Sequence, residues 1–360
     1  MEIIDNQKYI SIIEKCLNSF PQWEALDGKT IFLSGATGMI GSLLVDIIML
    51  RNETLESEKQ CRILAVGRNQ TYARKRFGKW FDKETFCFLT HDVSKPIQQL
   101  PWEVDYFIHA ASTTHPVAYA TEPVNTILSN VLGTYNLLEI ARKNANSKFL
   151  LLSSVEIYGE NRGDAEYFTE DYCGFIDCNT LRAGYPEGKR ASESLCQAYI
   201  SQYGVDAKIV RLPRCYGPTM RVSDTKALSQ FIKKGVSGED IVLKSAGNQL
   251  YSYTHVADAV RAILFVLIFG ERGQAYNVGD INSDITLKDL AKTISDYVGT
   301  RVIFEIPSEI ERQGYSTATK ALLNSEKIRT LGWTPIYSIV TGLHETIDIL
   351  HELNQSGGSI

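Results

Sequence analysis

Short apolar runs alternate with longer amphipathic segments along the first half of the chain. Five of the apolar runs have the length and composition of buried strands, at residues 30–34, 62–66, 85–89, 104–109 and 148–153. Helical stretches lie between them. Because parallel strands need crossover connections, this alternation predicts an α/β fold with a doubly wound parallel sheet, whose ligand crevice lies at the carboxyl ends of the strands.

The segments on either side of this region have different patterns. Residues 1–28 contain apolar residues that share one helical face, and we expect a helical extension that packs against the domain or a partner. Beyond residue 213, glycines break the pattern into shorter pieces. Helices are expected there at 256–269, at 287–297 behind a Thr286 cap, and at 338–353.

This organisation predicts one large domain and one smaller lobe, because a single hydrophobic core rarely grows beyond about 250–300 residues. The large domain covers 29–213, and later segments return to it. The rest divides into the extension at 1–28, a mainly substrate-binding mixed α/β lobe at 214–354, and a tail at 355–360.

Composition excludes several classes of function. The chain of 360 residues is 44% hydrophobic and 22% charged, as in ordinary globular proteins, and its net charge of −5 comes without a basic run. We therefore expect no nucleic acid and no membrane as partners, and a cytoplasmic location. The seven cysteines include no Cys-x-x-Cys pair, so free, mostly buried thiols are expected, and no histidine or cysteine spacing predicts a metal.

A glycine-rich turn connects the first predicted strand to an amphipathic helix. Gly35 allows the tight turn, Gly38 lets the backbone approach a pyrophosphate, and Gly41 permits close packing of the helix, whose first N–H groups face the anion. This context predicts a Rossmann domain that binds NAD or NADP. The second strand ends in Arg68 where an acidic residue would normally bind the ribose, which favours NADP slightly, and Asp92 and Val93 after the third strand are placed to contact the adenine.

Tyr185 and Lys189 are four residues apart, so one helical turn places them on the same face. The Lys189 ammonium can then lower the pKa of the Tyr185 phenol, and a phenol that ionises near neutral pH can take a proton from a hydroxyl group. Alone, this spacing is common in helices as a surface pair. Its position behind the glycine turn makes it a candidate catalytic pair.

Taken together, the motifs resemble the extended short-chain dehydrogenase/reductase superfamily, in its NAD-dependent epimerase/dehydratase branch, whose members act on nucleotide sugars. The resemblance runs from about residue 29 to residue 350. It is carried by Gly35-x-x-Gly38-x-x-Gly41, His109-Ala-Ala, Asn130 before Gly133-Thr134, Ser153-Ser154-x-x-x-Tyr158-Gly159, Tyr185-x-x-x-Lys189, Arg211 with Tyr216-Gly217-Pro218, and His255-Val256-x-Asp258.

The resemblance implies roles for these residues. Tyr185 takes the proton of the sugar C4 hydroxyl, Ser154 hydrogen-bonds that oxygen, and Lys189 holds the cofactor ribose. A tightly bound NAD or NADP would also contact Thr37, Met39, Ile40, Ala110, Ala111, Asn130 and Ser153. Members of the family usually form homodimers through two helices, here 122–143 and 185–203.

Glu156 is the residue on which the later chemistry depends. Both 4,6-dehydratases and UDP-glucuronate decarboxylases carry glutamate there, whereas simple 4-epimerases usually do not. A carboxylate that faces C5 could remove its proton, so a nucleotide-sugar 4,6-dehydratase with internal cofactor recycling is our first expectation, with decarboxylation or epimerisation as alternatives. The alternative is a purely structural role, in which Glu156 only hydrogen-bonds the backbone of the following loop. Val155 stands where dTDP-glucose dehydratases carry a second acid.

The short sequence motifs around the expected substrate pocket are most similar to those of UDP-glucuronate decarboxylases. They include Pro116-x-x-Tyr119 and Arg182-Ala183-x-Tyr185, and we expect Thr113 and Tyr119 to contact substrate. Two phosphate-side arginines are missing, since Tyr251 replaces one and Lys320 the other. Lys320 cannot form the bidentate fork of an arginine, and Arg221 is the residue that could compensate.

A function of another class stays open. The protein could be a non-catalytic regulatory or scaffold protein that retains only the dinucleotide domain. The intact set of Ser154, Tyr185 and Lys189 favours catalysis, because a protein released from catalysis need not retain it.

Overall fold

A seven-stranded parallel sheet forms the larger domain of the protein in the computed structural model, which describes residues 1–114, 119, 121–144, 146–305 and 318–357. The strand order is β10-β6-β5-β4-β1-β2-β3. The strands are β1 (Thr30–Ser34), β2 (Arg62–Gly67), β3 (Phe86–Thr90), β4 (Tyr106–His109), β5 (Lys148–Ser154), β6 (Asp206–Leu212) and β10 (Ala275–Asn277). The predicted fold class is therefore confirmed, although the pattern analysis did not identify β6 and β10.

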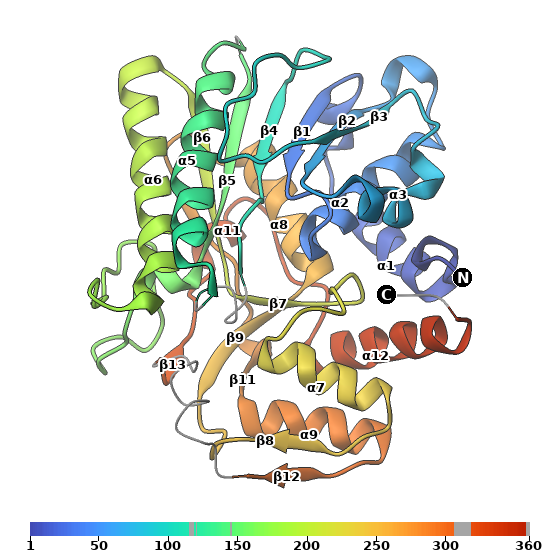
Figure 1. The fold of residues 1–360 in the computed structure, drawn as a ribbon, viewed down its shortest axis with the longest axis vertical. Helices are drawn as coiled ribbons and strands as arrows, with labels where there is room; N and C mark the ends of the chain where they lie inside the picture. The colour runs from blue at the N-terminus through green and yellow to red at the C-terminus, as the bar shows by residue number, and fades with distance from the viewer. Residues whose placement is uncertain (115–118, 120, 145, 306–317, 358–360) are drawn as a thin grey trace.

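Helices cover both faces of the sheet (Figure 1). One apolar cluster joins Phe32, Phe107 and Phe149 to α5 (Pro123–Ala141) and α6 (Gly184–Tyr203). The other cluster joins Ile31, Leu33 and their strand neighbours to α2 (Met39–Asn52) and α8 (Val256–Phe269). Alternate residues of each strand point to opposite faces, so the near-continuous apolar runs of the sequence are buried on both sides.

The chain reverses direction across the sheet between β1 and β4. It runs outward from β1 to β2 and β3, then returns to pair β4 with β1 in register Ser34 to His109. Open α/β sheets bind ligands at the carboxyl ends of strands where the order reverses. The expected crevice therefore lies beyond Ser34 and His109.

The smaller lobe occupies the lower part of Figure 1. In it β9 (Leu250–His255) pairs with β7 (Arg214–Tyr216), β11 (Asp284–Thr286) and β13 (Lys320–Ala321), while β8 (Ile241–Leu243) pairs with β12 (Val302–Phe304). Its helices are α7 (Ala227–Val236), α9 (Leu287–Val298) and α12 (Ile339–Gln355), whereas the short α11 (Glu326–Arg329) packs against β10 of the large domain. Thr286 caps α9 as expected, and α8 and β10 return to the large domain.

Two predictions at the carboxyl end differ from the structure or lie beyond it. Helix α12 begins after Ser338, as expected, but continues to Gln355, into the predicted tail. The last residues of that tail, 358–360, lie outside the described residues, as does Pro116.

The amino-terminal extension is part of the core. Helix α1 (Gln7–Asn18) buries Tyr9, Ile12, Ile13 and Cys16 and contacts α2, α8 and α12. Beneath it, the buried Asp46 of α2 accepts hydrogen bonds from Tyr9 Oη (2.6 Å) and Trp80 Nε1 (2.9 Å), and pairs with Arg76 of α3 (Gln70–Arg76). No helix in the described ranges is long and apolar enough to cross a membrane.

Replacing Asp46 with alanine should strongly destabilise the protein. The Arg76 guanidinium would be left unpaired in a buried position, at a cost of about 3–5 kcal/mol in the free energy of unfolding measured in urea. The control is Lys79→Ala, which breaks the exposed 3.1 Å pair with Glu53 and should cost at most about 1 kcal/mol. Equal effects would show that the Asp46 cluster does not anchor the extension.

Candidate active site

The glycine turn has the shape that a dinucleotide cradle requires. Gly35 has φ +71°, and a Cβ there would lie 2.7 Å from the backbone of Ala110 and Ala111 after β4. A Cβ on Gly41 would lie 2.5 Å from the Gly35 carbonyl oxygen. Helix α2 begins at Met39 without a side-chain cap, so its first N–H groups remain available to an anion. These residues fit a bound NAD or NADP.

Ser34 ties the turn to the next strand. Its carbonyl accepts from Ala110 N and its hydroxyl oxygen from Ala111 N, both at 3.2 Å. The same hydroxyl lies 2.8 Å from His109 Nδ1. Burial, and then the charge of Lys189, lowers the pKa of His109 to about 3, so this ring stays neutral and supports the crevice without acting as an acid.

Several other predicted cofactor contacts line the same edge of the sheet. Asn130 of α5 accepts from Ser112 Oγ (2.9 Å), which draws the chain after β4 against that helix. Val93 is buried. Burial would raise the pKa of Asp92, but hydrogen bonds from Ser94 and the charge of Arg68 outweigh it and lower that pKa. Ser153 Oγ is buried without a hydrogen-bond partner.

Tyr185 and Lys189 lie in the first turns of α6, beside the end of β5. Lys189 Nζ donates to the Leu152 carbonyl oxygen at 2.7 Å. Ser154 lies close enough to the Tyr185 phenol to lower its pKa. The expected lowering of the Tyr185 pKa is wrong for this structure. Burial raises that pKa, Ser154 only partly opposes the rise, and Lys189 is engaged with Leu152.

Glu156 is ion-paired. Arg182 Nη2 donates to its two carboxylate oxygens at 3.0 and 3.2 Å, and the guanidinium lies 5.0 Å from the centre of the Tyr119 ring. Tyr119 in turn stacks on Tyr185 at 5.2 Å. The alternative in which Glu156 only bonds the following loop is therefore not what the structure contains. The four side chains form one cluster, the Glu156 cluster, of Glu156, Arg182, Tyr119 and Tyr185.

Sequence reasoning gave Arg182 no role. Arg182 belongs to the motif that resembles decarboxylases, and its position three residues before Tyr185 is the feature of the sequence that could have placed it near the site. Behind the cluster, Tyr158 Oη donates to Asn277 (2.6 Å) and accepts from Arg211 (2.8 Å). Tyr158 is therefore fixed by hydrogen bonds in a buried position.

The predicted phosphate-side residues are dispersed. Arg221 donates to Thr37 O (3.0 Å) and Thr37 Oγ1 (2.8 Å), so it reaches the glycine turn. Tyr251 Oη donates to Ala318 O (2.6 Å). Lys320 pairs with Leu250 in the strand register and therefore faces away from the neighbouring Tyr251. Thr113 is half-buried just beyond β4.

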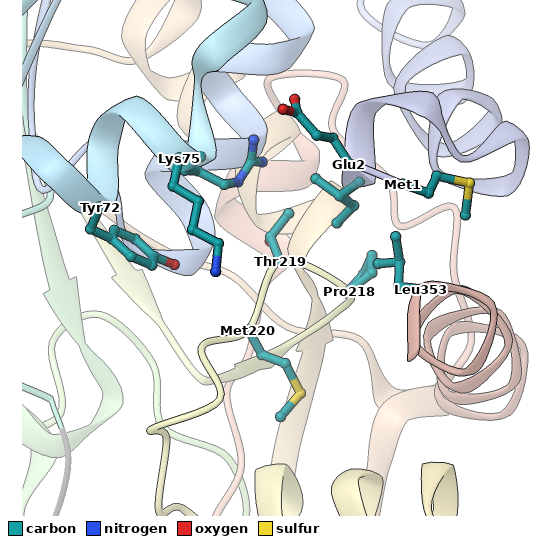
Figure 2. Close-up of a pocket in the computed structure, with 10 residues that line it drawn as sticks. Met1, Glu2, Tyr72, Lys75, Pro218, Thr219, Met220 and Leu353 are labelled. Atoms are coloured by element: carbon teal, nitrogen blue, oxygen red, sulfur yellow. The ribbon is translucent and has the colours of Figure 1, made fainter. Parts of the chain in front are cut away.

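The described residues include no grouping of three histidine, cysteine or acidic side chains that could hold a metal ion. All the cysteines are free, but Cys173 and Cys178 are exposed, against expectation. A hollow of about 250 Å³ lies apart from the Glu156 cluster. Figure 2 shows it between Tyr72 and Lys75 of α3 and the loop at 218–220.

Comparison with known proteins decides the family. A model of the NAD dependent epimerase/dehydratase family matches residues 31–279, more than half of the chain. The chain belongs to this family. The resemblance read from the motifs is therefore confirmed, and the protein is an enzyme of the NAD-dependent epimerase/dehydratase class.

Curated relatives of this family member are named as decarboxylases. UDP-glucuronic acid decarboxylase 1 of Xenopus tropicalis is 30% identical over 321 residues, covering 89% of this chain and 72% of that protein. UDP-glucuronic acid decarboxylase 5 of Arabidopsis thaliana is 32% identical over 316 residues, covering 87% of this chain and 86% of that protein.

Solved structures share the fold. The dTDP-glucose 4,6-dehydratase of Bacillus anthracis, in complex with NAD, has a TM-score of 0.73 at 21% identity, covering 92% of this chain and 98% of that one. The UDP-glucuronic acid 4-epimerase of Bacillus cereus, with UDP-glucuronic acid and NAD, has a TM-score of 0.74 at 20% identity, covering 90% and 99%.

Lys189 should make stability depend on pH. Burial lowers its pKa from 10.5 to about 8. Between pH 8 and pH 10.5 the folded protein binds fewer protons than the unfolded chain. Lys189 therefore lowers the free energy of unfolding most below pH 8, and this penalty shrinks as the pH rises toward 10.5. Lys189→Met should therefore gain stability at pH 7, and that gain should fall by about 2–3 kcal/mol between pH 8 and 10. A difference that does not vary with pH would contradict this assignment.

Proposed function

We propose that the protein acts on a nucleotide hexuronate, oxidising the sugar at C4 and then releasing the C6 carboxylate as carbon dioxide. The observation that carries this proposal is the Glu156–Arg182 ion pair beside Tyr185 and Tyr119. It supplies a guanidinium next to the residues expected at C4, where a substrate carboxylate can exchange for Glu156. The decarboxylase names of relatives at 30–32% identity support the same choice.

The first step uses the arrangement at the start of α6. Tyr185, in its phenolate form, takes the C4 hydroxyl proton, and Ser154 hydrogen-bonds the same oxygen. When bound, the nicotinamide supplies a hydride acceptor for the C4 hydrogen and later returns it. The resulting ketone is β to the C6 carboxylate, so loss of carbon dioxide leaves an enolate that the C4 oxygen stabilises.

Protonation at C5 and return of hydride to C4 complete a pentose product without net oxidation. Arg182 orients the departing carboxylate, and Tyr185 gives its proton back to the C4 oxygen. No external reductant is consumed. The protein must hold the sugar, move one proton at Tyr185 and let a second proton, drawn from solvent, reach C5, because carbon dioxide leaves without one.

Dehydration, our first expectation from the sequence, is the second candidate. It is favoured by the Glu156 carboxylate, which could remove the C5 proton once its pair with Arg182 opens. It also needs an acid for the C6 hydroxyl, and Val155 at the expected position is a buried apolar side chain. Decarboxylation needs no such acid.

The reaction can be identified from product mass. Purified protein is incubated with UDP-glucuronate, UDP-glucose, dTDP-glucose and GDP-mannose. Loss of carbon dioxide from UDP-glucuronate is expected, whereas loss of water from a neutral hexose would make the protein a dehydratase, and unchanged mass with altered stereochemistry an epimerase. No turnover with any donor, despite bound dinucleotide, would favour the non-catalytic alternative.

Arg182→Gln should lower kcat/KM for UDP-glucuronate by about 10- to 100-fold, chiefly through KM, because a charged hydrogen bond contributes about 1.5–3 kcal/mol. Arg162→Gln is the matched control, since Arg162 is exposed and its ion pair with Glu160 is long, at 3.8 Å. An unchanged KM in Arg182→Gln would remove Arg182 from the substrate site.

We propose NADP as the preferred cofactor. The residues that end β2 and follow it, Gly67, Arg68 and Asn69, include no carboxylate to repel a 2′-phosphate, and Arg68 is exposed. Titration calorimetry should give a lower Kd for NADP⁺ than for NAD⁺, and Arg68→Asp should reverse the order. Tighter binding of NAD⁺ by the unaltered protein would contradict this choice.

We also propose a homodimer. Helix α5 exposes one apolar face, made by Val124, Ile127, Leu128, Leu132 and Tyr135, and α5 packs along α6. The spacing of these residues places them on one side of the helix, as a surface shared with a second copy requires. The two helices named from the sequence, 122–143 and 185–203, are α5 and α6.

Sedimentation measurements should therefore give the mass of a dimer. Leu128→Glu should yield monomers, because each copy would have to bury an unpaired carboxylate in the apolar interface. The control, Val340→Glu, changes an equally exposed apolar residue on α12 and should leave the dimer intact. A monomeric unaltered protein would refute the proposal.

A further inference from the structure

Arg214 lies flat against an aromatic ring at the junction of the two lobes. It begins β7, where it pairs with Tyr253 of β9, and its Cζ is 3.4 Å from the centre of the Tyr251 ring. Partner residues on neighbouring parallel strands point to the same face, so Arg214, Tyr251 and Tyr253 share one side of the lobe sheet. The ring holds the plane of the guanidinium.

The guanidinium has no anionic partner within the described ranges. Its Nη1 is buried and makes no hydrogen bond. Other largely buried arginines are each paired with a carboxylate, Arg76 with Asp46, Arg211 with Glu193 and Arg261 with Asp258. A partly buried cation without an ionic partner costs free energy that aromatic stacking offsets only in part. Arg214 is therefore positioned for an anion that the described part of the chain does not supply.

The position of Arg214 indicates that this anion would lie near the active site. The next residue, Cys215, faces the other side of β7 and is close enough to Tyr185 to influence its pKa, so the strand itself passes beside the active site. Tyr251, on which Arg214 stacks, occupies the position where the sequence led us to expect a phosphate-binding arginine. Lys320, the other expected cation, faces away from Tyr251. Arg221 is engaged with Thr37.

We propose that Arg214 binds the diphosphate of the nucleotide-sugar substrate, with Tyr251 as the platform that orients it. In this chain β7 supplies the guanidinium that the sequence led us to expect on β9, at position 251. The positive charge is therefore retained on a neighbouring strand. This inference rests on the proposed function. An arginine fork can bond two phosphate oxygens at once, which a lysine cannot do.

The test compares UDP with uridine in titration calorimetry of the protein saturated with its dinucleotide. Arg214→Gln should weaken UDP binding by about 10- to 100-fold, as expected for the loss of charge-assisted hydrogen bonds, and leave uridine binding unchanged. Arg214→Lys should give an intermediate loss. The control Arg301→Gln, in the same lobe, removes an exposed arginine that pairs with Asp240 and should bind UDP normally.

Three further measurements separate this role from a structural one. UDP binding by the unaltered protein should weaken with added salt more steeply than binding by Arg214→Gln. Thermal stability without nucleotide should be unchanged or higher in Arg214→Gln, since an unpaired cation is removed. The double variant Arg214→Asn/Tyr251→Arg, which moves the guanidinium to β9, should recover UDP affinity that Arg214→Asn loses.

Equal UDP affinity in Arg214→Gln and the unaltered protein would overturn the inference while leaving the proposed function standing. A parallel loss of uridine affinity and thermal stability would assign Arg214 a structural role and would also overturn it. If the unaltered protein binds none of UDP, dTDP, CDP and GDP, the proposed function fails first and the diphosphate role falls with it.

Discussion

The close approach of the glycine turn to the end of β4 is the constraint on which the rest of the site depends. At Gly35 any side chain would collide with the backbone of Ala110 and Ala111, and at Gly41 with the turn itself. This approach directs the uncapped first turn of α2 into the crevice where the strand order reverses. A cofactor held there fixes where C4 of a substrate must lie, and hence which side chains can act on it.

Burial determines the protonation of the groups around that point. It raises the pKa of Tyr185 and lowers the pKa of Lys189, so the buried site disfavours charge on both groups. Glu156 is paired with the cation of Arg182, whereas among the described residues Arg214 is paired only with an aromatic ring. The site thus contains one satisfied ion pair and one unsatisfied cation. We interpret the first as a carboxylate subsite and the second as a phosphate subsite.

Sequence patterns predicted the features that depend on neighbouring residues along the chain. The five strand runs and the bounds of α8 follow from apolar periodicity, and the cradle follows from three glycines between a strand and a helix. The short strands β7, β11 and β13 carry too few residues to show a period. Their register decides that Lys320 and Tyr251 face opposite ways, which no spacing along the chain encodes. The raised pKa of Tyr185 was missed because the i, i+4 rule ignores burial, which raises that pKa, and the Leu152 carbonyl that engages Lys189.

The central claim is that chemistry begins with oxidation at C4 and ends with return of the same hydrogen. The most direct test is a single turnover of UDP-glucuronate that carries deuterium at C4, followed by the near-ultraviolet absorbance of reduced nicotinamide and by the mass of the product. The account predicts a transient rise in absorbance, slowed by deuterium, and a pentose product that retains the label. A labelled substrate that loses its deuterium to water, or turnover without any transient reduced cofactor, would contradict it.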